Sequence, residues 1–178
     1  MSLAPGTPWT RELLGDAQIE ALFGEAAQVA LLKRVEVAFL EAQAEVGVLD
    51  AGRVAEAVAA VEAAGLDPAA LVDGTSVDGV VVPALVRALR GGRDIVHTGL
   101  TSQDVIDAAA VLTARAVDRV LAVRLSEVVA RIDDLASRFG DREMGGRTRM
   151  QWAGPLPVAE RLRSWGGPVV RGGARRGR

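Results

Sequence analysis

Apolar residues recur at spacings of three to five along one long stretch, residues 101–139, which no proline or glycine interrupts. This period is typical of an α-helix that buries one face. At a rise of 1.5 Å per residue the helix would span roughly 55–60 Å. Because so apolar a rod cannot stay exposed, the pattern predicts that it lies in a bundle with other long helices, which we expect partner subunits to supply. The repeating positions are Val105, Ala109, Leu112, Ala116, Val120, Val123, Val128, Ile132, Leu135 and Phe139.

Shorter helical patterns come before the rod. Residues 26–46 and 50–64 repeat apolar side chains at helical spacing and are each followed by a glycine, and a third such pattern ends at Arg90. The chain is therefore predicted to be all-α. We expect a small helical N-terminal domain, residues 1–95, followed by the start of a long-helix bundle domain, residues 96–165.

The last stretch, residues 166–178, has a different character. It is rich in glycine and arginine and has no hydrophobic period. Such composition is typical of a disordered segment. We therefore expect a disordered tail here.

Composition narrows the possible partners and cofactors. With no cysteine and one histidine among 178 residues, neither a disulfide framework nor a cysteine- or histidine-rich metal site within one chain is expected. The formal net charge of −2 gives no reason to expect nucleic acid. No apolar run is as long as a membrane span, and the first residues lack the features of a signal peptide. We expect a cytoplasmic protein without a cofactor.

The only histidine begins the string His97-Thr98-Gly99-Leu100-Thr101-Ser102-Gln103-Asp104. Thr101 followed three residues later by Asp104 resembles a capping box at the start of the long helix. The free N–H groups and the dipole of such a helix end attract anions. A helix cap with no ligand is the simpler interpretation of these residues taken alone.

A second candidate segment follows the rod and reads Gly145-Gly146-Arg147-Thr148-Arg149-Met150-Gln151. Paired glycines beside an arginine and a threonine can form a backbone nest for a carboxylate. An arginine-bearing loop between helices explains the same residues equally well.

Together the two strings resemble signature regions of the fumarase/aspartase superfamily, and within it most closely the 3-carboxy-cis,cis-muconate cycloisomerases. The resemblance runs from about Gly15 to about Trp165. The segment Val77–Leu89 is similar to the cycloisomerases' Gly-Asn-x-x-x-Pro-Leu-Val, with Gly79 in place of the asparagine. Adenylosuccinate lyases carry a Glu-His-Asp motif there, and this chain has no histidine at that place.

The resemblance implies a tetrameric helical bundle that acts on a small polycarboxylate without a metal or organic cofactor. It implies closure of 3-carboxy-cis,cis-muconate to a carboxymuconolactone, a step of aromatic-acid breakdown. Carried over position by position, it makes His97 and Ser102 catalytic and gives substrate binding to Thr101, Ser102, Arg147, Thr148 and Gln151. Arg149 stands where the family has His or Trp. Its guanidinium binds anions but cannot shuttle a proton.

The family's mobile Gly-Ser-Ser-x-Met-Pro loop, whose serine acts as a base in the lyases, does not occur in this sequence. We therefore expect the chain alone to be weakly active or inactive. Two alternatives remain open. One is a superfamily lyase that releases fumarate, and the other is a non-catalytic helical module that oligomerises through residues 101–139.

Overall fold

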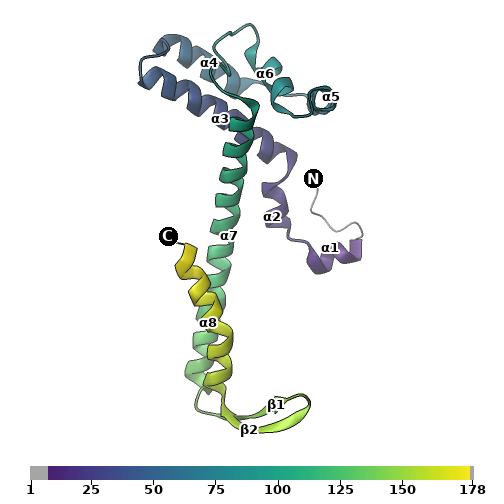
Figure 1. The fold of residues 1–178 in the computed structure, drawn as a ribbon, viewed down its shortest axis with the longest axis vertical. Helices are drawn as coiled ribbons and strands as arrows, with labels where there is room; N and C mark the ends of the chain where they lie inside the picture. Colours follow the sequence, from purple (N-terminus) through teal and green to yellow (C-terminus); the bar gives the residue numbers. More distant parts are fainter. Residues whose placement is uncertain (1–7, 177–178) are drawn as a thin grey trace. The chain divides into compact units, whose positions relative to one another are not determined.

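A computed structural model describes residues 8–176, which form helices and one two-stranded hairpin (Figure 1). The predicted all-α fold is confirmed, apart from the hairpin. In chain order the elements are α1 (Pro8–Leu14), α2 (Ala17–Leu22), α3 (Glu25–Glu45), α4 (Ala51–Ala63), α5 (Pro68–Asp78), α6 (Val82–Arg90), α7 (Ser102–Phe139), β1 (Glu143–Thr148), β2 (Gln151–Pro157) and α8 (Val158–Arg176).

Local chemistry sets the ends of the short helices. The carboxylates of Asp16, Asp50 and Asp67 each accept a hydrogen bond from a backbone N–H in the first turn of α2, α4 and α5, which satisfies donors that the helix leaves free. Gly79 ends α5 in the left-handed region, with φ 76°, where glycine carries no steric penalty. These helix boundaries therefore follow from single residues.

The chain divides into two compact units between Val117 and Asp118. This division lies inside α7, well past the boundary expected between residues 95 and 96. The reason is packing, because Val105 and Ala109 on the first turns of α7 are buried in the same cluster as Ile95 and Val96. The first turns of the long helix thus belong with the N-terminal helices.

Unit 1 has a closed apolar core. Leu40 from α3, Val61 from α4 and Leu85 from α6 are almost completely buried in it, and Figure 1 shows α3 and α4 lying side by side. Gly74 on α5 lies against Ala84 on α6, so closely that a β-carbon at position 74 would collide with the alanine methyl group. The absence of a side chain at Gly74 therefore lets α5 and α6 approach each other.

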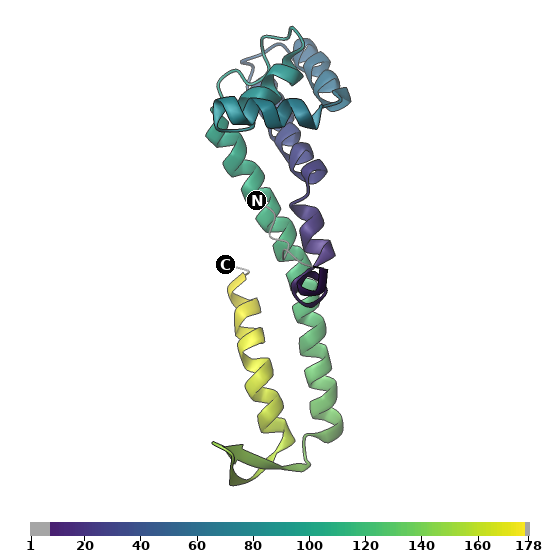
Figure 2. The same ribbon diagram turned by 90° about the vertical axis from the view of Figure 1, so that its right-hand side faces the viewer.

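Unit 2 consists of the later part of α7, the β1–β2 hairpin and α8, which runs back along α7 (Figure 2). A β-carbon at Gly166 would lie 3.3 Å from Ile132 on α7. Ala122 and Val129 of α7 line one shallow groove together with Val169 of α8. Contact between the two helices is thus close at the glycine and looser toward the end of α8.

The predicted disordered tail is wrong for residues 166–176, which are helical as part of α8. Residues 177–178 lie outside the described part of the chain. Glycine and Pro168 inside α8 give this segment a poor intrinsic helix propensity. At the start of this segment Gly166 lies against Ile132 of α7, a contact that composition alone does not reveal.

The hairpin was not anticipated from the sequence. β1 and β2 pair antiparallel, with a bulge after Gly146. The ring of Trp152 lies over Gly145 and the side chain of Leu156 over Gly146. Neither glycine has a positive φ angle, so the expected backbone nest does not form. The paired glycines instead make room for side chains of the neighbouring strand.

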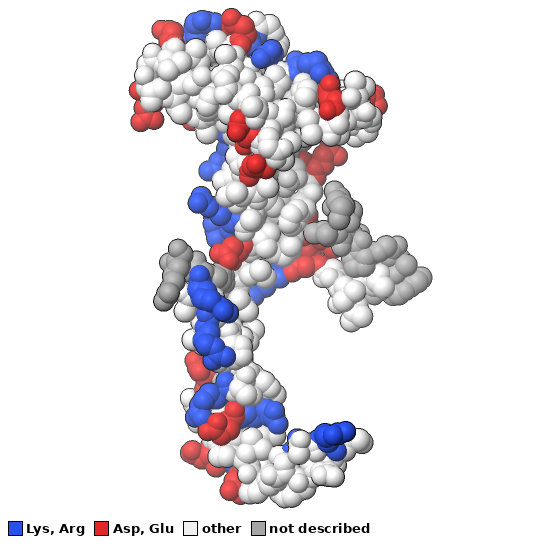
Figure 3. All heavy atoms as spheres, in the orientation of Figure 1, with Lys and Arg blue, Asp and Glu red and all other residues white. Residues whose placement is uncertain are grey.

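Acidic and basic side chains are interspersed over the visible surface of unit 1 in Figure 3. Blue side chains gather at the tip of the hairpin (Figure 3), and the basic residues between positions 143 and 157 are Arg147 and Arg149. Within the described part of the chain, no helix has both the length and the apolar character needed to cross a membrane.

Candidate functional site

The segment between α6 and α7 carries the sequence-predicted histidine, and hydrogen bonds from several side chains hold its backbone. Arg90 Nε donates to the carbonyl of Val96 at 3.1 Å, and Thr98 Oγ1 donates to the carbonyl of Asp94 at 2.7 Å. From α3, Gln43 Nε2 donates to the carbonyl of Thr98 at 3.1 Å. The segment is therefore fixed at several points along its length.

Gly99 lies over α3, and a β-carbon there would come within 3.5 Å of the Phe39 ring and 3.7 Å of the Gln43 amide. Its φ of 98° is in the region that favours glycine. His97 also has a positive φ, 63°, which is uncommon for a residue with a side chain. The segment thus holds its histidine in an unusual backbone conformation above α3.

His97 Nδ1 lies 2.6 Å from Glu36 Oε1. The Glu36 side chain is 0% exposed and that of His97 is 15% exposed. Sequence reasoning did not identify Glu36, because it occupies a position on the buried stripe of α3. The sequence feature that could have identified Glu36 is its spacing of four residues from both Leu32 and Leu40. Residues at this spacing lie on one face of a helix, so the carboxylate lies on the buried face.

The predicted capping box is confirmed. The backbone N–H of Thr101 donates to Asp104 Oδ2 at 2.8 Å, its hydroxyl donates to the same oxygen at 2.7 Å, and the N–H of Asp104 lies 3.3 Å from Thr101 Oγ1. These bonds, with a smaller contribution from His97, hold the pKa of Asp104 below its ordinary value of 3.8, although slight desolvation opposes them. The donors of Thr101 are therefore already in use.

Ser102 is the first residue of α7, where backbone N–H groups have no partner inside the helix. Its side chain is half-buried. Unlike Thr101, its hydroxyl takes part in no hydrogen bond with the residues that the structure describes. Ser102 is consequently the better placed of the two to donate to a ligand.

The other predicted binding residues lie on the hairpin and are exposed. Thr148 pairs with Gln151, and Arg147 lies opposite Trp152. Arg149 and Met150 form the two-residue turn, with φ angles of 40° and 67°, the conformation of a type I′ hairpin turn. Arg149 thus lies at the tip of the hairpin.

The predicted residues therefore fall into two groups, each in its own unit. His97, Thr101 and Ser102 belong to unit 1, where the first two lie on the segment before α7 and Ser102 begins that helix. Arg147, Thr148 and Gln151 belong to unit 2.

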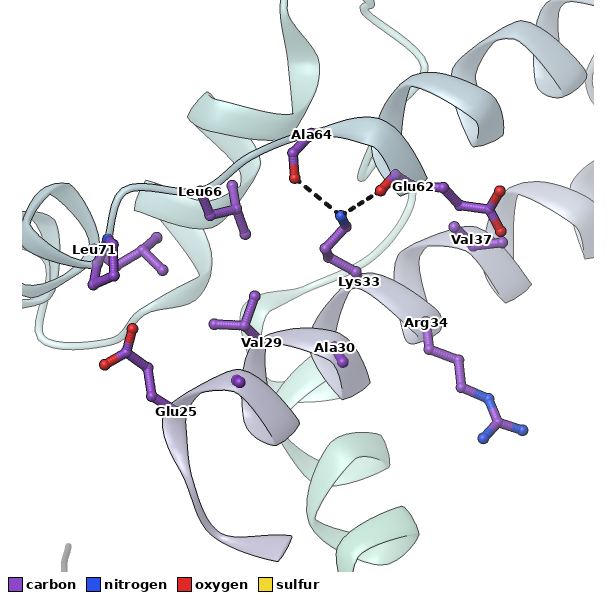
Figure 4. A pocket seen from close by; sticks show the side chains of 12 residues that line it. Glu25, Val29, Ala30, Lys33, Arg34, Val37, Glu62, Ala64, Leu66 and Leu71 are labelled. Carbon is purple, nitrogen blue, oxygen red and sulfur yellow. Dashed lines mark hydrogen bonds between the residues drawn. The ribbon is translucent and has the colours of Figure 1, made fainter. Parts of the chain in front are cut away.

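An open groove of about 660 Å³ lies elsewhere in unit 1, beside α3, and none of the predicted site residues lines it (Figure 4). Lys33 Nζ donates to the carbonyls of Glu62 and Ala64 at 2.9 and 3.1 Å, which places a positive charge at the end of α4 (Figure 4). This is the favourable end of a helix for a cation, so Lys33 stabilises α4. Across residues 8–176, no group of three or more acidic or histidine side chains could hold a metal ion.

Comparison with known proteins places these features in a family. Residues 10–175 match the lyase family. A 3-carboxy-cis,cis-muconate cycloisomerase of Pseudomonas aeruginosa is 34% identical over 87% of this chain and 36% of the relative. A fumarate lyase structure from Mesorhizobium has a TM-score of 0.85 at 28% identity, covering 90% of this chain and 39% of the other. A β-carboxy-cis,cis-muconate cycloisomerase structure from Acinetobacter calcoaceticus has a TM-score of 0.79 at 26% identity, with the same coverage.

These matches cover most of this chain but only part of its relatives. The chain spans little more than a third of the length of the relatives it matches. The family match reaches residue 175. The resemblance was expected to end near Trp165, which is too early. The structure agrees with the longer match, because α8 continues to Arg176. With its signature loop, capped long helix and match over most of its length, the chain belongs to the lyase family of the fumarase/aspartase superfamily.

Proposed function

We propose that this chain acts in the closure of 3-carboxy-cis,cis-muconate to a carboxymuconolactone. The observation that carries the proposal is the start of α7, five residues after His97, where the Ser102 hydroxyl has no partner among the described residues and the first backbone N–H groups have none inside the helix. Similarity to cycloisomerases from two bacterial genera supports this substrate over others.

The reaction is an isomerisation, so every atom of the substrate remains in the product. A carboxylate oxygen forms a bond to one carbon of the diene, the π electrons move toward the carbon next to another carboxylate, and a proton is added there. Negative charge builds up on that carboxylate in the transition state. Fixed donors at the start of a helix stabilise such charge, because they need no reorganisation.

In this proposal His97 and Ser102 are the catalytic residues at the reacting end. Ser102 also binds substrate, together with Thr101. Thr101 donates to substrate only when it gives up a bond to Asp104. Arg147, Thr148 and Gln151 bind a second carboxylate, for which the guanidinium of Arg147 is suited.

A lyase that releases fumarate is the second candidate, and the likeness to a fumarate lyase structure favours it. Both reactions place charge on a carboxylate next to the reacting carbon. They differ in whether the carbon skeleton stays whole, so product analysis separates them.

The proposal includes self-association through unit 2. Val123, Val128 and Leu135 on α7 are 58%, 45% and 39% exposed in the single chain. Apolar side chains repeated along one helix in this way are typical of a bundle interface. We expect a homo-oligomer, and sedimentation of the purified chain measures its size.

The test combines ligand binding with product analysis. We expect 3-carboxy-cis,cis-muconate to raise the melting temperature of the purified chain, because a ligand that binds only the folded state stabilises it. Ser102→Ala and Arg147→Ala should each reduce the shift. Ser126→Ala is the matched control, because the Ser126 hydroxyl donates to a carbonyl of its own helix and is exposed.

Turnover by the chain alone is expected to be weak or absent. Any lactone formed should disappear in the Ser102→Ala variant. Release of fumarate from succinyl-bearing substrates, without a response to 3-carboxymuconate, would support the second candidate. An oligomer that responds to no carboxylate would contradict both and favour a non-catalytic helical module.

A further inference from the structure

Glu36 is the one acidic residue among residues 8–176 whose side chain is completely buried inside the core. It lies between Leu32 and Leu40 on the buried stripe of α3. A carboxylate in this position loses its hydration, which is costly unless a partner compensates. An apolar side chain of similar size would complete the stripe without that cost, so the core itself gives no reason for an acid here.

The partner of Glu36 is His97. Oε1 lies 2.6 Å from Nδ1 of the ring, while Oε2 is buried and accepts no hydrogen bond from the described residues. The backbone around His97 is held separately, through Arg90, Thr98 and Gln43. These bonds to the loop backbone do not involve Glu36, whose hydrogen bond is with the imidazole ring.

The hydrogen bond with Glu36 determines which nitrogen of the His97 ring carries the hydrogen. An ionised carboxylate only accepts hydrogen bonds. With Glu36 ionised, Nδ1 carries the hydrogen of the neutral ring and Nε2 is its unprotonated nitrogen. Nε2 is not among the buried polar atoms that lack a partner, and no described residue bonds to it, so this nitrogen is open to a ligand.

We propose that Glu36 is a positioning residue that fixes the tautomer of His97 and leaves Nε2 as the nitrogen that meets the substrate. This inference deepens the proposed function and rests on it for the identity of the ligand. The tautomer itself does not depend on that function.

The test uses the fact that His97 is the only histidine in the chain. Labelling histidine with nitrogen-15 in the full-length chain gives ring signals from one residue. At a pH where the ring is neutral, we expect Nδ1 to show the chemical shift of a protonated nitrogen and Nε2 that of an unprotonated one.

Glu36→Met removes the acceptor and keeps the volume similar. The ring should then shift toward the Nε2–H tautomer, which the free side chain prefers. We expect the variant to remain folded, because an apolar residue suits this position, and circular dichroism verifies it. Glu41→Met is the matched control, since Glu41 lies on the same helix and is exposed, and it should leave the ring signals unchanged.

The ligand step uses 3-carboxy-cis,cis-muconate as the probe. Its addition should move the Nε2 signal of the unmodified chain more than the Nδ1 signal. An Nε2–H tautomer in the unmodified chain, or identical spectra for it and for folded Glu36→Met, would overturn the role of Glu36. Binding that moves neither nitrogen would overturn the contact with Nε2. Absence of binding would contradict the proposed function and leave the tautomer result to decide on Glu36.

Discussion

The two units of this chain differ in how far they bury their apolar side chains. Of the apolar residues buried in the described part of the chain, all but Leu162 lie in unit 1. In unit 2, Val123, Val128 and Trp165 remain largely exposed in the single chain. The same kinds of residue thus build a closed core in one region and an open face in the other.

This difference indicates how each unit is stabilised. The elements of unit 1 surround their own core, so it has the means to fold by itself. Unit 2 presents a long apolar helix face with little of its own chain to cover it, which is the arrangement expected when further helices complete a bundle. The site residues follow the same division, since His97 is fixed in unit 1 and the hairpin residues are exposed in unit 2.

The sharpest test of the comparison is a matched pair of truncations. Leu85→Ala removes a side chain that is 0% exposed and should lower the free energy of unfolding of unit 1 by about 2–5 kcal/mol. Leu135→Ala removes one that is 39% exposed and should change a monomeric chain by less than about 1 kcal/mol. Urea unfolding combined with hydrogen exchange of the α6 and α7 amides measures both effects. If both variants lowered the free energy of unfolding of a monomer equally, the division into a closed and an open region would be contradicted.

Glycines test the closeness of packing in the two units. Gly74→Ala forces a methyl group against Ala84 and should destabilise unit 1 by about 1–3 kcal/mol. Gly172 on α8 has open space around it, so Gly172→Ala should stabilise that helix by about 0.5–1 kcal/mol. Thermal unfolding followed by circular dichroism gives the sign of each change. A stabilising Gly74→Ala would show that α5 and α6 are not held in contact.

The cap of α7 can be tested by substitution and by pH. Thr101→Ala should lower stability by about 1 kcal/mol. The pKa of Asp104 is lower in the folded chain than its ordinary value of 3.8, so the ionised group stabilises the fold above that value. This contribution is lost as the pH falls through the lower folded value.

Asp104→Asn should therefore reduce stability at neutral pH and flatten the loss of stability on acidification. Asp107→Asn, three residues further along the same helix, is the control, because Asp107 accepts a hydrogen bond from the Gln103 side chain rather than from the cap. Unfolding curves between pH 2 and pH 7 compare the variants. If Asp104→Asn lost stability at low pH as steeply as the unmodified chain, the stabilising role of the ionised Asp104 would be contradicted.

Substitutions at the hairpin tip are expected to change stability the least. Arg149 and Met150 both have positive φ angles, and Asn-Gly is the pair that such a turn prefers. Replacing them by Asn-Gly should slow hydrogen exchange in β1 and β2 and raise stability by less than about 1 kcal/mol, because the hairpin is exposed and opens locally. Faster exchange would show that the side chains at the tip contribute more than the turn geometry.

The sequence by itself determined most of the helical elements, the long α7, its capping box and the family, but not the helix α1 (Pro8–Leu14), because residues 1–14 were expected to be extended. These depend on local signals such as apolar period, glycine stops and a Thr-x-x-Asp cap, which one segment carries alone. The tertiary structure decided the rest. Glu36 is recognisable as a partner of His97 only when the loop folds over α3. The glycines at 145 and 146 are explained only by Trp152 and Leu156 across the hairpin, and the helix over residues 166–176 continues α8 past the point where Gly166 lies against Ile132 of α7. Each of these features joins residues that are apart in sequence, and for such pairs the free energy of contact outweighs what composition and local propensity predict.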